Sequence, residues 1–304
     1  TLHPKFPSKC CSRPEARHKR KVAQLAMGLS RSTEPIIITA DSDVRMGDSD
    51  LPTLVSMVCG APTSSVSKQA VGIAFASLVE EAPRTRWDRV SAALVGGSAQ
   101  NFMALYGLYR LIGGVPSMAG ALLAISRRAL SEIGDFQGVR TILGEDYELA
   151  RRLCEAGYSV ELSPLPARCS DGGRSLRGVI ARVGRWLMVV RAQRPLLLLT
   201  YPIFMAATPP LVLASLFLRT PRLSLFACAL WSSRTLLSYL LRRAQGLRPT
   251  VLQSALEVLS AELLLWAGLG KALATRQVSW RGYRFRIARG GHMIPEAQSP
   301  PVRT

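Results

Sequence analysis

The chain has 304 residues, enough for one large domain or two, and carries a formal net charge of +19 from 39 Lys and Arg against 20 Asp and Glu. Its six cysteines form no Cys-x-x-Cys pair and no His-linked spacing, which excludes the usual zinc and redox motifs. With 48% hydrophobic residues and a mean hydropathy of +0.17, it holds more apolar residues than a soluble core alone would need.

Strands and helices are predicted to alternate over the first 165 residues, which indicates an α/β fold. Residues 1–20 are polar, basic and proline-containing, and are expected to be irregular. Val22 to Leu29 has apolar residues at the helical period, and the run Ile36 to Ala40 predicts a buried strand of a parallel sheet. The further predicted elements are a helix at 51–59, a helix-like stretch at 71–81, a polar link at 83–89, a helix at 102–111, a strand at 121–125, a short helix from 126 to 134, a helix after Gly144 and a strand at 160–162.

Two carboxylates, Asp41 and Asp43, follow the first predicted strand directly. Parallel sheets bind ligands at the carboxyl ends of their strands, and residues i and i+2 of an extended segment point the same way. Both side chains can therefore face one bound cation or its water shell, which is the chemistry of a metal-held diphosphate. The alternative is that these aspartates only cap a polar turn after the strand.

Asp146 stands at the start of the helix predicted after Gly144. The helix dipole and the free backbone N–H groups stabilise a carboxylate there, so Glu145 and Asp146 can be ordinary first-turn residues. The functional interpretation makes Asp146 a general base that takes a proton from an attacking hydroxyl group. The tripeptide from Gly144 to Asp146 does not by itself decide between these interpretations.

A third feature is the pentapeptide from Arg182 to Trp186. On a helix, Arg182, Arg185 and Trp186 share one face, because they are spaced i, i+3 and i+4. The two guanidinium groups can grip phosphate oxygens, while the indole packs against a sugar or closes the pocket. The alternative is an amphipathic helix at the membrane surface with Trp186 as its interfacial anchor, and both interpretations can hold at once.

Three long apolar stretches occupy much of the C-terminal third of the chain, namely Leu196 to Leu218, Leu223 to Leu241 and Val251 to Leu273. Each approaches the roughly 20 residues needed to cross a bilayer, which predicts transmembrane or interfacial helices over residues 195–275. Arg234, Glu257 and Glu262 interrupt these stretches and are expected to face protein, water or the interface. A buried helical bundle is the alternative.

Basic residues cluster at 5–21, 168–194 and 271–303, with seven in each cluster. Two of the clusters flank the apolar region, as in juxtamembrane segments that face an anionic cytoplasmic leaflet. This pattern predicts a multi-pass protein with a cytoplasmic catalytic region and a basic cytoplasmic tail at 276–304. A pI near 10.7 would also suit nucleic acid, but the sequence shows no nucleic-acid-binding module, so no nucleic acid partner is expected.

Taken in order along the chain, these motifs resemble one known family. The matching segments are Lys21 to Leu25, Asp41 to Val44, Gly120 to Arg128, Glu145 to Leu149 and Arg182 to Trp186. They resemble the membrane-bound family 2 glycosyltransferases, and most closely the branch of ceramide glucosyltransferase and the hopanoid-associated glycosyltransferases. The resemblance covers residues 20–195, with a looser match from Ser279 to Gly282.

The resemblance implies a GT-A type, Rossmann-like nucleotide-sugar-binding domain over residues 21–194, followed by an α-helical transmembrane region. It implies a UDP-sugar donor, a divalent cation (Mg or Mn) and an inverting transfer to a membrane lipid, ceramide-like or hopanoid-like. It also implies that the protein lies in the cell inner membrane, against an anionic bilayer.

The same resemblance assigns roles to individual residues. Asp146 would act as the catalytic base, and Asp41 and Asp43 would hold the metal ion. The residues implied for donor binding are Lys21, Asp41, Asp43, Arg182, Arg185 and Trp186. Gly120 and Glu145 would belong to a loop on the acceptor side.

The chain departs from the family pattern in three respects. The family carries a transmembrane helix and its first strands before the segment matched at Lys21, so the domain is expected to be N-terminally truncated. Gln24 stands where Asn is usual, and Asp135 stands where a second Gly is common. Two other functions are therefore retained: a processive polysaccharide synthase-like glycosyltransferase, and a non-catalytic truncated membrane protein that binds anionic lipid.

Overall fold

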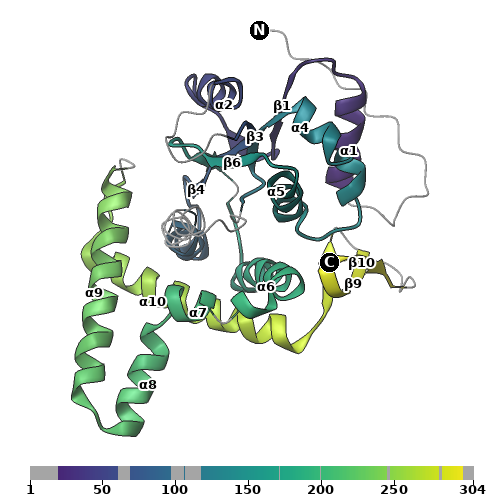
Figure 1. Ribbon diagram of the computed structural model, residues 1–304. Coiled ribbons are helices and arrows are strands. Elements are labelled where there is room, and N and C mark those ends of the chain that lie inside the picture. The colour runs from purple at the N-terminus through teal and green to yellow at the C-terminus, as the bar shows by residue number, and fades with distance from the viewer. Residues whose placement is uncertain are drawn as a thin grey trace.

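The computed structural model describes residues 20–60, 69–96, 106, 118–170, 172–198, 200–244, 247–280 and 283–296. An α/β region from the first half of the chain is followed by a set of longer helices (Figure 1). Helices α6 (Leu176–Gln193) and α10 (Val251–Ala274) pack against each other beneath the α/β region in this view. Helices α8 (Thr208–Leu218) and α9 (Pro221–Ala244) form a hairpin that extends away from it.

The main sheet is mixed in direction. Its described strands lie in the order β1 (Ile36–Ala40), β5 (Leu122–Ser126), β3 (Val71–Phe75) and β6 (Ser159–Leu162). Strand β5 runs antiparallel to both β1 and β3, while β3 and β6 are parallel. The strand predicted at residues 36–40 is confirmed, but its assignment to a parallel sheet is wrong. An apolar run indicates burial and does not encode the direction of the neighbouring strand.

Helices cover both faces of this sheet (Figure 1). Alternate residues of β3 and β5 point to opposite faces, as the period of two requires. Phe75 and Ile125 belong to the core beneath α1, α4 and α5, whereas Ala74 and Leu122 belong to the core beneath α2. The helices are α1 (Arg20–Ser30), α2 (Asp50–Cys59), α4 (Arg127–Glu132) and α5 (Glu145–Glu155), and each confirms a helix predicted from the sequence.

The segment after α2 differs from its prediction. Residues 71–81 were expected to be helix-like, but they form β3 and β4 (Leu78–Glu80), because a short apolar run does not distinguish a strand from a buried helix. Residues 86–96 are helical and replace part of the polar link predicted at 83–89. The helix predicted at 102–111 lies outside the described residues, except Tyr106, which is helical. A second sheet has the order β2 (Val44–Arg45), β7 (Ala167–Cys169) and β4.

The first predicted membrane span is interrupted. The stretch from Leu196 to Leu218 divides into a 3-10 turn η2 (Pro195–Leu197), α7 (Thr200–Met205) and α8, and each piece is too short to cross a bilayer alone. Among the described residues, α10 is the one helix long and apolar enough to cross a membrane, and half of its apolar stretch is buried inside the protein. A third sheet follows it, in the order β10 (Met293–Pro295), β9 (Tyr283–Ile287) and β8 (Gln277–Trp280).

Charged side chains from α9 and α10 stabilise the break between α7 and α8. Arg234 donates to the carbonyl oxygen of Met205 at 2.5 Å, at the end of α7, and pairs with Glu262 at 2.7 Å. Glu262 accepts hydrogen bonds of 3.0 Å from the backbone N–H and the hydroxyl of Thr208, at the start of α8. A carbonyl group at the end of α7 and an N–H group at the start of α8 are therefore both hydrogen-bonded. Arg234 and Glu262 face protein, as predicted for charged residues within these stretches.

Helix α6 rests on α10 at a crossing of two glycines. A Cβ atom at Gly268 would lie 2.5 Å from Cγ1 of Val183, and one at Gly184 would lie 3.2 Å from Cδ of Lys271. Around this crossing, Leu187 and other apolar side chains of the two helices share one core cluster. The close approach of α10 therefore fixes the position of α6 and of the arginines that α6 carries.

Asp88, which is buried in the helix at 86–96, holds the segment that leads into α6. Its carboxylate accepts backbone N–H bonds from Arg84 and Thr85 at 3.1 and 2.8 Å, and from Gly173 and Arg174 at 2.8 and 2.9 Å. Burial alone would raise the pKa of Asp88, but the N–H donors outweigh burial and hold this pKa well below its usual range. Asp88 thus ties the helix at 86–96 to the chain before α6.

We expect Asp88→Asn to lower the free energy of unfolding by about 2 kcal/mol near pH 7, because an amide oxygen accepts these N–H bonds more weakly than a carboxylate does. The folded-state pKa is depressed, so the stabilisation is present above the unfolded-state pKa of about 4 and is lost as the pH falls through the folded-state pKa. Chemical denaturation near pH 7 and near pH 3 should show the difference between wild type and variant shrinking at the lower pH.

The matched control is Asp48→Asn, at an exposed turn, which should leave the free energy of unfolding unchanged. A difference between wild type and Asp88→Asn that is equal at both pH values would contradict the role given to the buried carboxylate.

Candidate active site

The end of β1 lies beside the loop that precedes β5. Ala40 pairs with Leu122 in the antiparallel ladder, and the N–H of Asp41 donates to the carbonyl oxygen of Ala121 at 2.8 Å. Because the two strands run in opposite directions, the residues after β1 meet the residues before β5. The pairing therefore brings together Asp41 and Gly120, two residues predicted for the site.

Lys21 of α1 reaches the same point. Its Nζ lies 2.6 Å from Oδ1 of Asp41 and 3.8 Å from Oε1 of Glu145, and it donates to the carbonyl oxygen of Gly120 at 3.1 Å. Burial by itself would lower the pKa of Lys21, but the charges of Glu145 and Asp41, with a smaller contribution from Asp146, raise it above its ordinary value. The ammonium group stays charged and neutralises acids contributed by β1 and α5.

Asp146 faces the loop before β5. Its Oδ2 accepts a hydrogen bond from the N–H of Gly120 at 3.1 Å, and its Oδ1 accepts one from the N–H of Tyr147 at 2.9 Å. A side chain at Gly120 has little room, because a Cβ atom there would lie 3.1 Å from Oδ2 of Asp146. Asp146 is thus a first-turn residue of α5 and also a member of a larger group. We call that group the carboxylate cluster, and it consists of Lys21, Asp41, Gly120, Glu145 and Asp146.

A second group of residues lines a pocket next to α6. This arginine pocket has a volume of about 330 Å³ and is lined by Asp43, Arg174, Gly178, Arg182 and Arg185. That volume lies within the range of ligand pockets, roughly 300–1,000 Å³. Strand β2 pairs with β7, and the N–H of Ser170 donates to the carbonyl oxygen of Asp43 at 3.2 Å. This pairing brings Asp43 to the segment that leads into α6.

Three guanidinium groups and the carboxylate of Asp43 line the arginine pocket, and Glu80 and Asp88 lie behind Arg182 and Arg174 as their ion-pair partners. Arg182 pairs with Glu80, donates to the hydroxyl of Ser91 at 3.3 Å, and lies 4.7 Å from the ring centroid of Trp186. Burial, followed by the charge of Arg182, lowers the pKa of Arg185. An anion bound here would relieve the repulsion between the guanidinium groups and accept their hydrogen bonds. Phosphate is the anion that such a set of arginines suits best.

Cys169 of β7 connects the carboxylate cluster with the arginine pocket. Burial is the main cause that raises the pKa of its thiol to about 12, and the charges of Asp43 and Asp41 raise this pKa further, while Arg182 lowers it. The backbone joins the two groups directly, because the N–H of Val44 donates to the carbonyl oxygen of Asp41 at 3.1 Å. Asp41 and Asp43 therefore stand on one tight turn between β1 and β2, and not on the extended segment predicted for them. Every site residue predicted from the sequence belongs to one of the two groups, apart from Trp186, which stacks on Arg182. The roles of these residues remain predictions.

Two residues of this neighbourhood were missed in the sequence. Arg174 lines the arginine pocket and reaches Glu80 at 3.4 Å and Asp88 at 3.7 Å. It stands in the basic cluster at 168–194, but before the helical pattern that distinguished Arg182 and Arg185. Glu80 is buried at the end of β4, in the segment predicted to be helix-like. If β4 had been predicted as a strand, the position of Glu80 at its end would have indicated a site residue.

Comparison with known proteins shows several similarities. The profile of glycosyl transferase family 21 matches residues 1–293. Ceramide glucosyltransferase 3 of Caenorhabditis elegans is 26% identical over 178 residues, which cover 56% of this chain and 38% of that protein, so the match spans less than half of the curated relative. A mannosyltransferase from Pyrobaculum calidifontis, solved in complex with GDP-Man and Mn2+, aligns over 84% of this chain and 67% of its own, with 18% identity and a TM-score of 0.38. A TM-score of 0.38 is too low to indicate a shared ligand or mechanism.

We expect Gly120→Ala to lower the free energy of unfolding by about 1–2 kcal/mol, because the added methyl group crowds Asp146 and the packed loop around it. Gly28→Ala is the matched control: no heavy atom lies within 4 Å of a Cβ at Gly28, and alanine favours the helix α1. Denaturant unfolding of the three proteins measures the difference. Equal stability of Gly120→Ala and Gly28→Ala would contradict the close contact between the loop and Asp146.

Proposed function

Because this chain belongs to glycosyl transferase family 21, we propose that it transfers a sugar from a UDP-sugar to a hydroxyl group of a membrane lipid, ceramide-like or hopanoid-like, with inversion at the anomeric carbon. The observation that carries the proposal is the meeting of the carboxylate cluster and the arginine pocket at the ends of β1 and β7. When a sugar is transferred, the acceptor hydroxyl loses a proton and the departing diphosphate gains negative charge. A carboxylate can take that proton, and the lysine and arginines can stabilise the negative charge.

The arginine pocket is the proposed site of the donor diphosphate. Arg182 and Arg185 would hold the phosphate oxygens, and Arg174 would add a third positive charge. Trp186 is 38% exposed and stacks on Arg182, so its indole is available to pack against the nucleotide or the sugar. The guanidinium groups would stabilise the negative charge that the diphosphate gains as it departs.

Asp41 and Asp43 suit a divalent cation such as Mg or Mn. Within the described ranges, no group of three or more His, Cys, Asp and Glu side chains is placed to hold a metal ion by protein ligands alone. Such ions, however, commonly bind one or two carboxylates and take their other ligands from water and substrate phosphates. The two aspartates therefore fit a cation that binds together with the diphosphate. When bound, it would supply positive charge to the leaving group.

Asp146 is the proposed general base. It would take the proton of the acceptor hydroxyl as that oxygen forms its bond to the anomeric carbon and the bond from this carbon to the diphosphate breaks. The electron pair of the broken bond would leave with the diphosphate. The N–H of Gly120, 3.1 Å from Oδ2, orients the carboxylate for this role.

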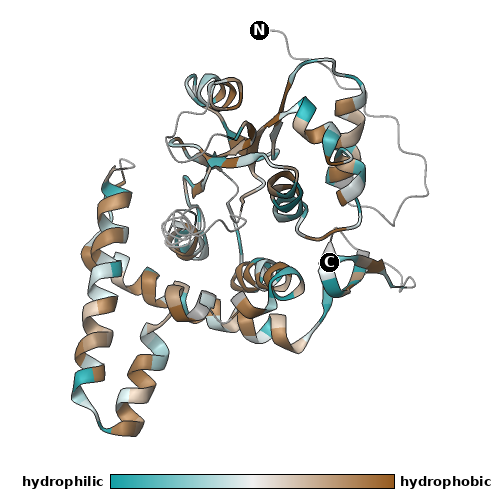
Figure 2. Ribbon diagram, in the orientation of Figure 1, coloured by the Kyte–Doolittle hydropathy of each residue, from teal (hydrophilic) through white to brown (hydrophobic). Residues whose placement is uncertain are grey.

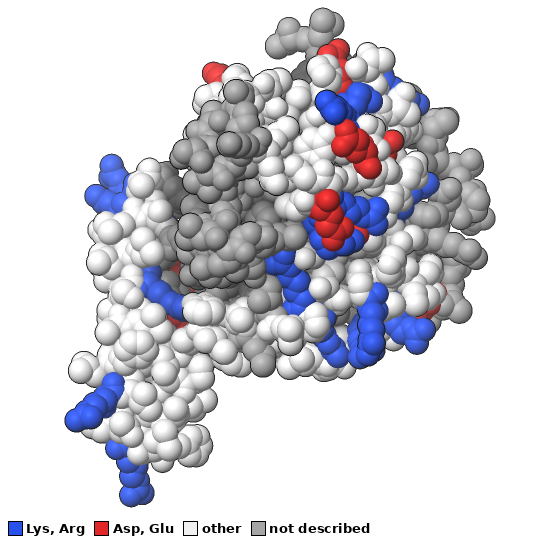
Figure 3. Space-filling view, in the orientation of Figure 1, with Lys and Arg blue, Asp and Glu red and all other residues white. Residues whose placement is uncertain are grey.

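The hairpin of α8 and α9 supports a membrane location. Large apolar side chains are exposed on both helices, including Leu213, Leu216, Phe217, Leu225, Phe226, Leu236 and Leu240. Figure 2 shows hydrophobic residues along the hairpin, and Figure 3 shows basic side chains at its tip. Apolar side chains of this kind can enter the acyl region of a bilayer while basic groups contact anionic lipid phosphates. The proposed location is the cell inner membrane, with a multi-pass topology and a cytoplasmic catalytic domain.

In membranes that contain the full chain, radiolabelled UDP-sugar with Mn2+ or Mg2+ should label lipid. We expect Asp146→Asn to lower this transfer by about 100-fold or more while UDP binding persists, since only the base is lost. We expect Asp41→Ala to weaken Mn2+-dependent UDP binding by about tenfold or more, because a charged ligand of the cation is removed. Calorimetric titration of the purified chain with UDP, with and without Mn2+, measures the binding.

Asp48→Ala, which removes an exposed carboxylate outside both groups, is the control and should change neither measurement. Equal loss of UDP binding in Asp146→Asn and Asp41→Ala would contradict the separate roles. A wild-type chain with no labelled lipid and no Mn2+-dependent heat would indicate a non-catalytic protein. A labelled polymer in place of a glycolipid would indicate a polysaccharide synthase.

A further inference from the structure

The segment just before Asp146 is held by the third sheet, which lies at the other end of the chain. Residues 141–143 lead into α5, and they run antiparallel to residues 291–293, which lead into β10. Two backbone hydrogen bonds join the segments, and the N–H of Leu143 donates one of them to the carbonyl oxygen of Gly291 at 2.8 Å. The third sheet therefore fixes the course of the chain that carries the proposed base.

Gln193, the last residue of α6, contacts both segments. Its Nε2 donates to the carbonyl oxygen of Gly144 at 3.1 Å, and a Cβ atom at Gly144 would lie only 2.7 Å from its Oε1. A Cβ atom at Gly291 would lie 3.2 Å from Nε2 of the same side chain. There is thus no room for a side chain at Gly144 and little room at Gly291. The amide of Gln193 is held between the segment before the base and the turn before β10.

The end of α6 also contacts the residue that follows the base. The guanidinium carbon of Arg194 lies 4.2 Å from the ring centroid of Tyr147. The N–H of Tyr147, in turn, donates to Oδ1 of Asp146 at 2.9 Å. Gln193 and Arg194 therefore contact α5 on both sides of Asp146, at Gly144 and at Tyr147. The direction of the Asp146 carboxylate depends on where α6 ends.

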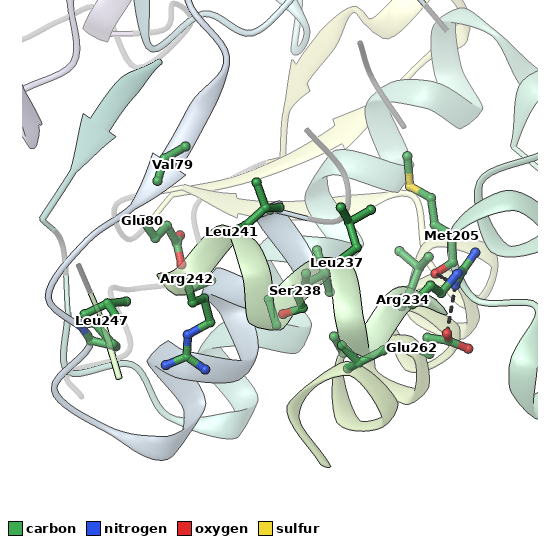
Figure 4. Close-up of a pocket in the computed structure, with 18 residues that line it drawn as sticks. Val79, Glu80, Met205, Arg234, Leu237, Ser238, Leu241, Arg242, Leu247 and Glu262 are labelled. Carbon is green, nitrogen blue, oxygen red and sulfur yellow. Dashed lines mark hydrogen bonds and ion pairs between the residues drawn. The ribbon is translucent and has the colours of Figure 1, made fainter. Parts of the chain in front are cut away.

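Both supports of the segment are attached to α10. Arg191 of α6 donates to the carbonyl oxygen of Ala272 at 2.5 Å, where α10 ends and the chain leads into β8. Closer to the middle of α10, Glu262 pairs with Arg234 of α9 at 2.7 Å, as Figure 4 shows. The proposed base is therefore connected, through Gln193 and the third sheet, to the helix that, of those described, is long and apolar enough to cross a membrane.

The amide of Gln193 contributes little to global stability. Its Oε1 is buried without a hydrogen-bond partner among the residues that the structure describes. The carbonyl oxygen of Gly144 already accepts a hydrogen bond of 3.1 Å from the N–H of Glu148 in α5, so it would stay paired without Gln193. A buried amide oxygen without a donor costs free energy, and an apolar side chain of the same length would avoid that cost. The amide therefore orients Gly144 more than it stabilises the fold.

We propose that Gln193 and Gly291 position Asp146 for proton transfer, so that the end of α6 and the third sheet form part of the active site. The inference rests on the proposed function, in which Asp146 takes the proton of the acceptor hydroxyl. Gln193 is a positioning residue, because it acts through Gly144 and not on the substrate. Its contact keeps the Asp146 carboxylate directed toward Gly120.

The first test is Gln193→Met, which keeps the length of the side chain but removes the N–H donor. In membranes that contain the full chain, we expect kcat for sugar transfer to lipid to fall about tenfold, because the base is misplaced. The KM for the UDP-sugar and the denaturant midpoint should stay as in wild type, and hydrogen–deuterium exchange at residues 141–147 should rise about tenfold. Gln137→Met, at an exposed glutamine of η1 (Phe136–Val139), is the matched control and should change none of these measurements.

The second test compares Gly291→Ala with Gly290→Ala. The two glycines have φ angles of +82° and +74°, so alanine strains the turn similarly at both positions. At Gly291 the added methyl group crowds Gln193, whereas at Gly290 the nearest atom is 3.6 Å away, on His292. Both variants should lose similar stability, but only Gly291→Ala should lower kcat, by about tenfold. Combined with Gln193→Ala, which removes the crowded side chain, Gly291→Ala should lower kcat no further.

Equal losses of kcat in Gly291→Ala and Gly290→Ala would overturn the proposal, as would additive losses in the double variant. So would unchanged exchange at residues 141–147 in Gln193→Met, or a fall in kcat matched by a fall in the denaturant midpoint, which would indicate a merely structural role. Because exchange is measured without turnover, its failure differs from failure of the proposed function, which would appear as a wild-type chain without labelled lipid and without Mn2+-dependent UDP binding.

Discussion

The antiparallel pairing of β1 with β5 is the constraint on which the candidate site depends. Its register places Ala40 opposite Leu122, so the chain after one strand meets the chain before the other. In a parallel pair, those two segments would lie at opposite edges of the sheet. Asp41 and Gly120 would then be separated by the length of a strand. The carboxylate cluster forms because the strands run in opposite directions.

The candidate site also requires the close packing of α6 against α10. Gly184 and Gly268 allow these helices to approach closely, and the crossing sets the position of Arg182 and Arg185 relative to Asp43. The helix that bears Arg182 and Arg185 is therefore attached to the helix that, among the described residues, is long and apolar enough to cross a membrane. Such an attachment suits the proposed function, in which a water-soluble donor and a lipid acceptor must reach one place.

Some residues of the candidate site were predicted from the sequence, and others were not. The helical face of Arg182, Arg185 and Trp186 was predicted from spacing alone, since helical geometry is local and the period of 3.6 residues determines which side chains are neighbours. The contact of Glu80 with Arg182 was not predicted, because β4 and α6 are far apart in the sequence. The break between α7 and α8 lies directly before Pro209 and Pro210, which mark it in the sequence, whereas the contacts of Arg234 and Glu262 that stabilise it come from other helices and were not predicted.

By itself, the sequence determined the family, most of the helices and strands, and the residue types that the site uses, because periodicity, helix ends and short motifs are properties of neighbouring residues. Tertiary structure decided the direction of β1 relative to β5, the contacts of Arg234 and Glu262 with the ends of α7 and α8, and the burial of Glu80 against Arg182. These features depend on pairs of residues far apart along the chain. Their energies come from packing and hydrogen bonds that exist only once distant segments meet.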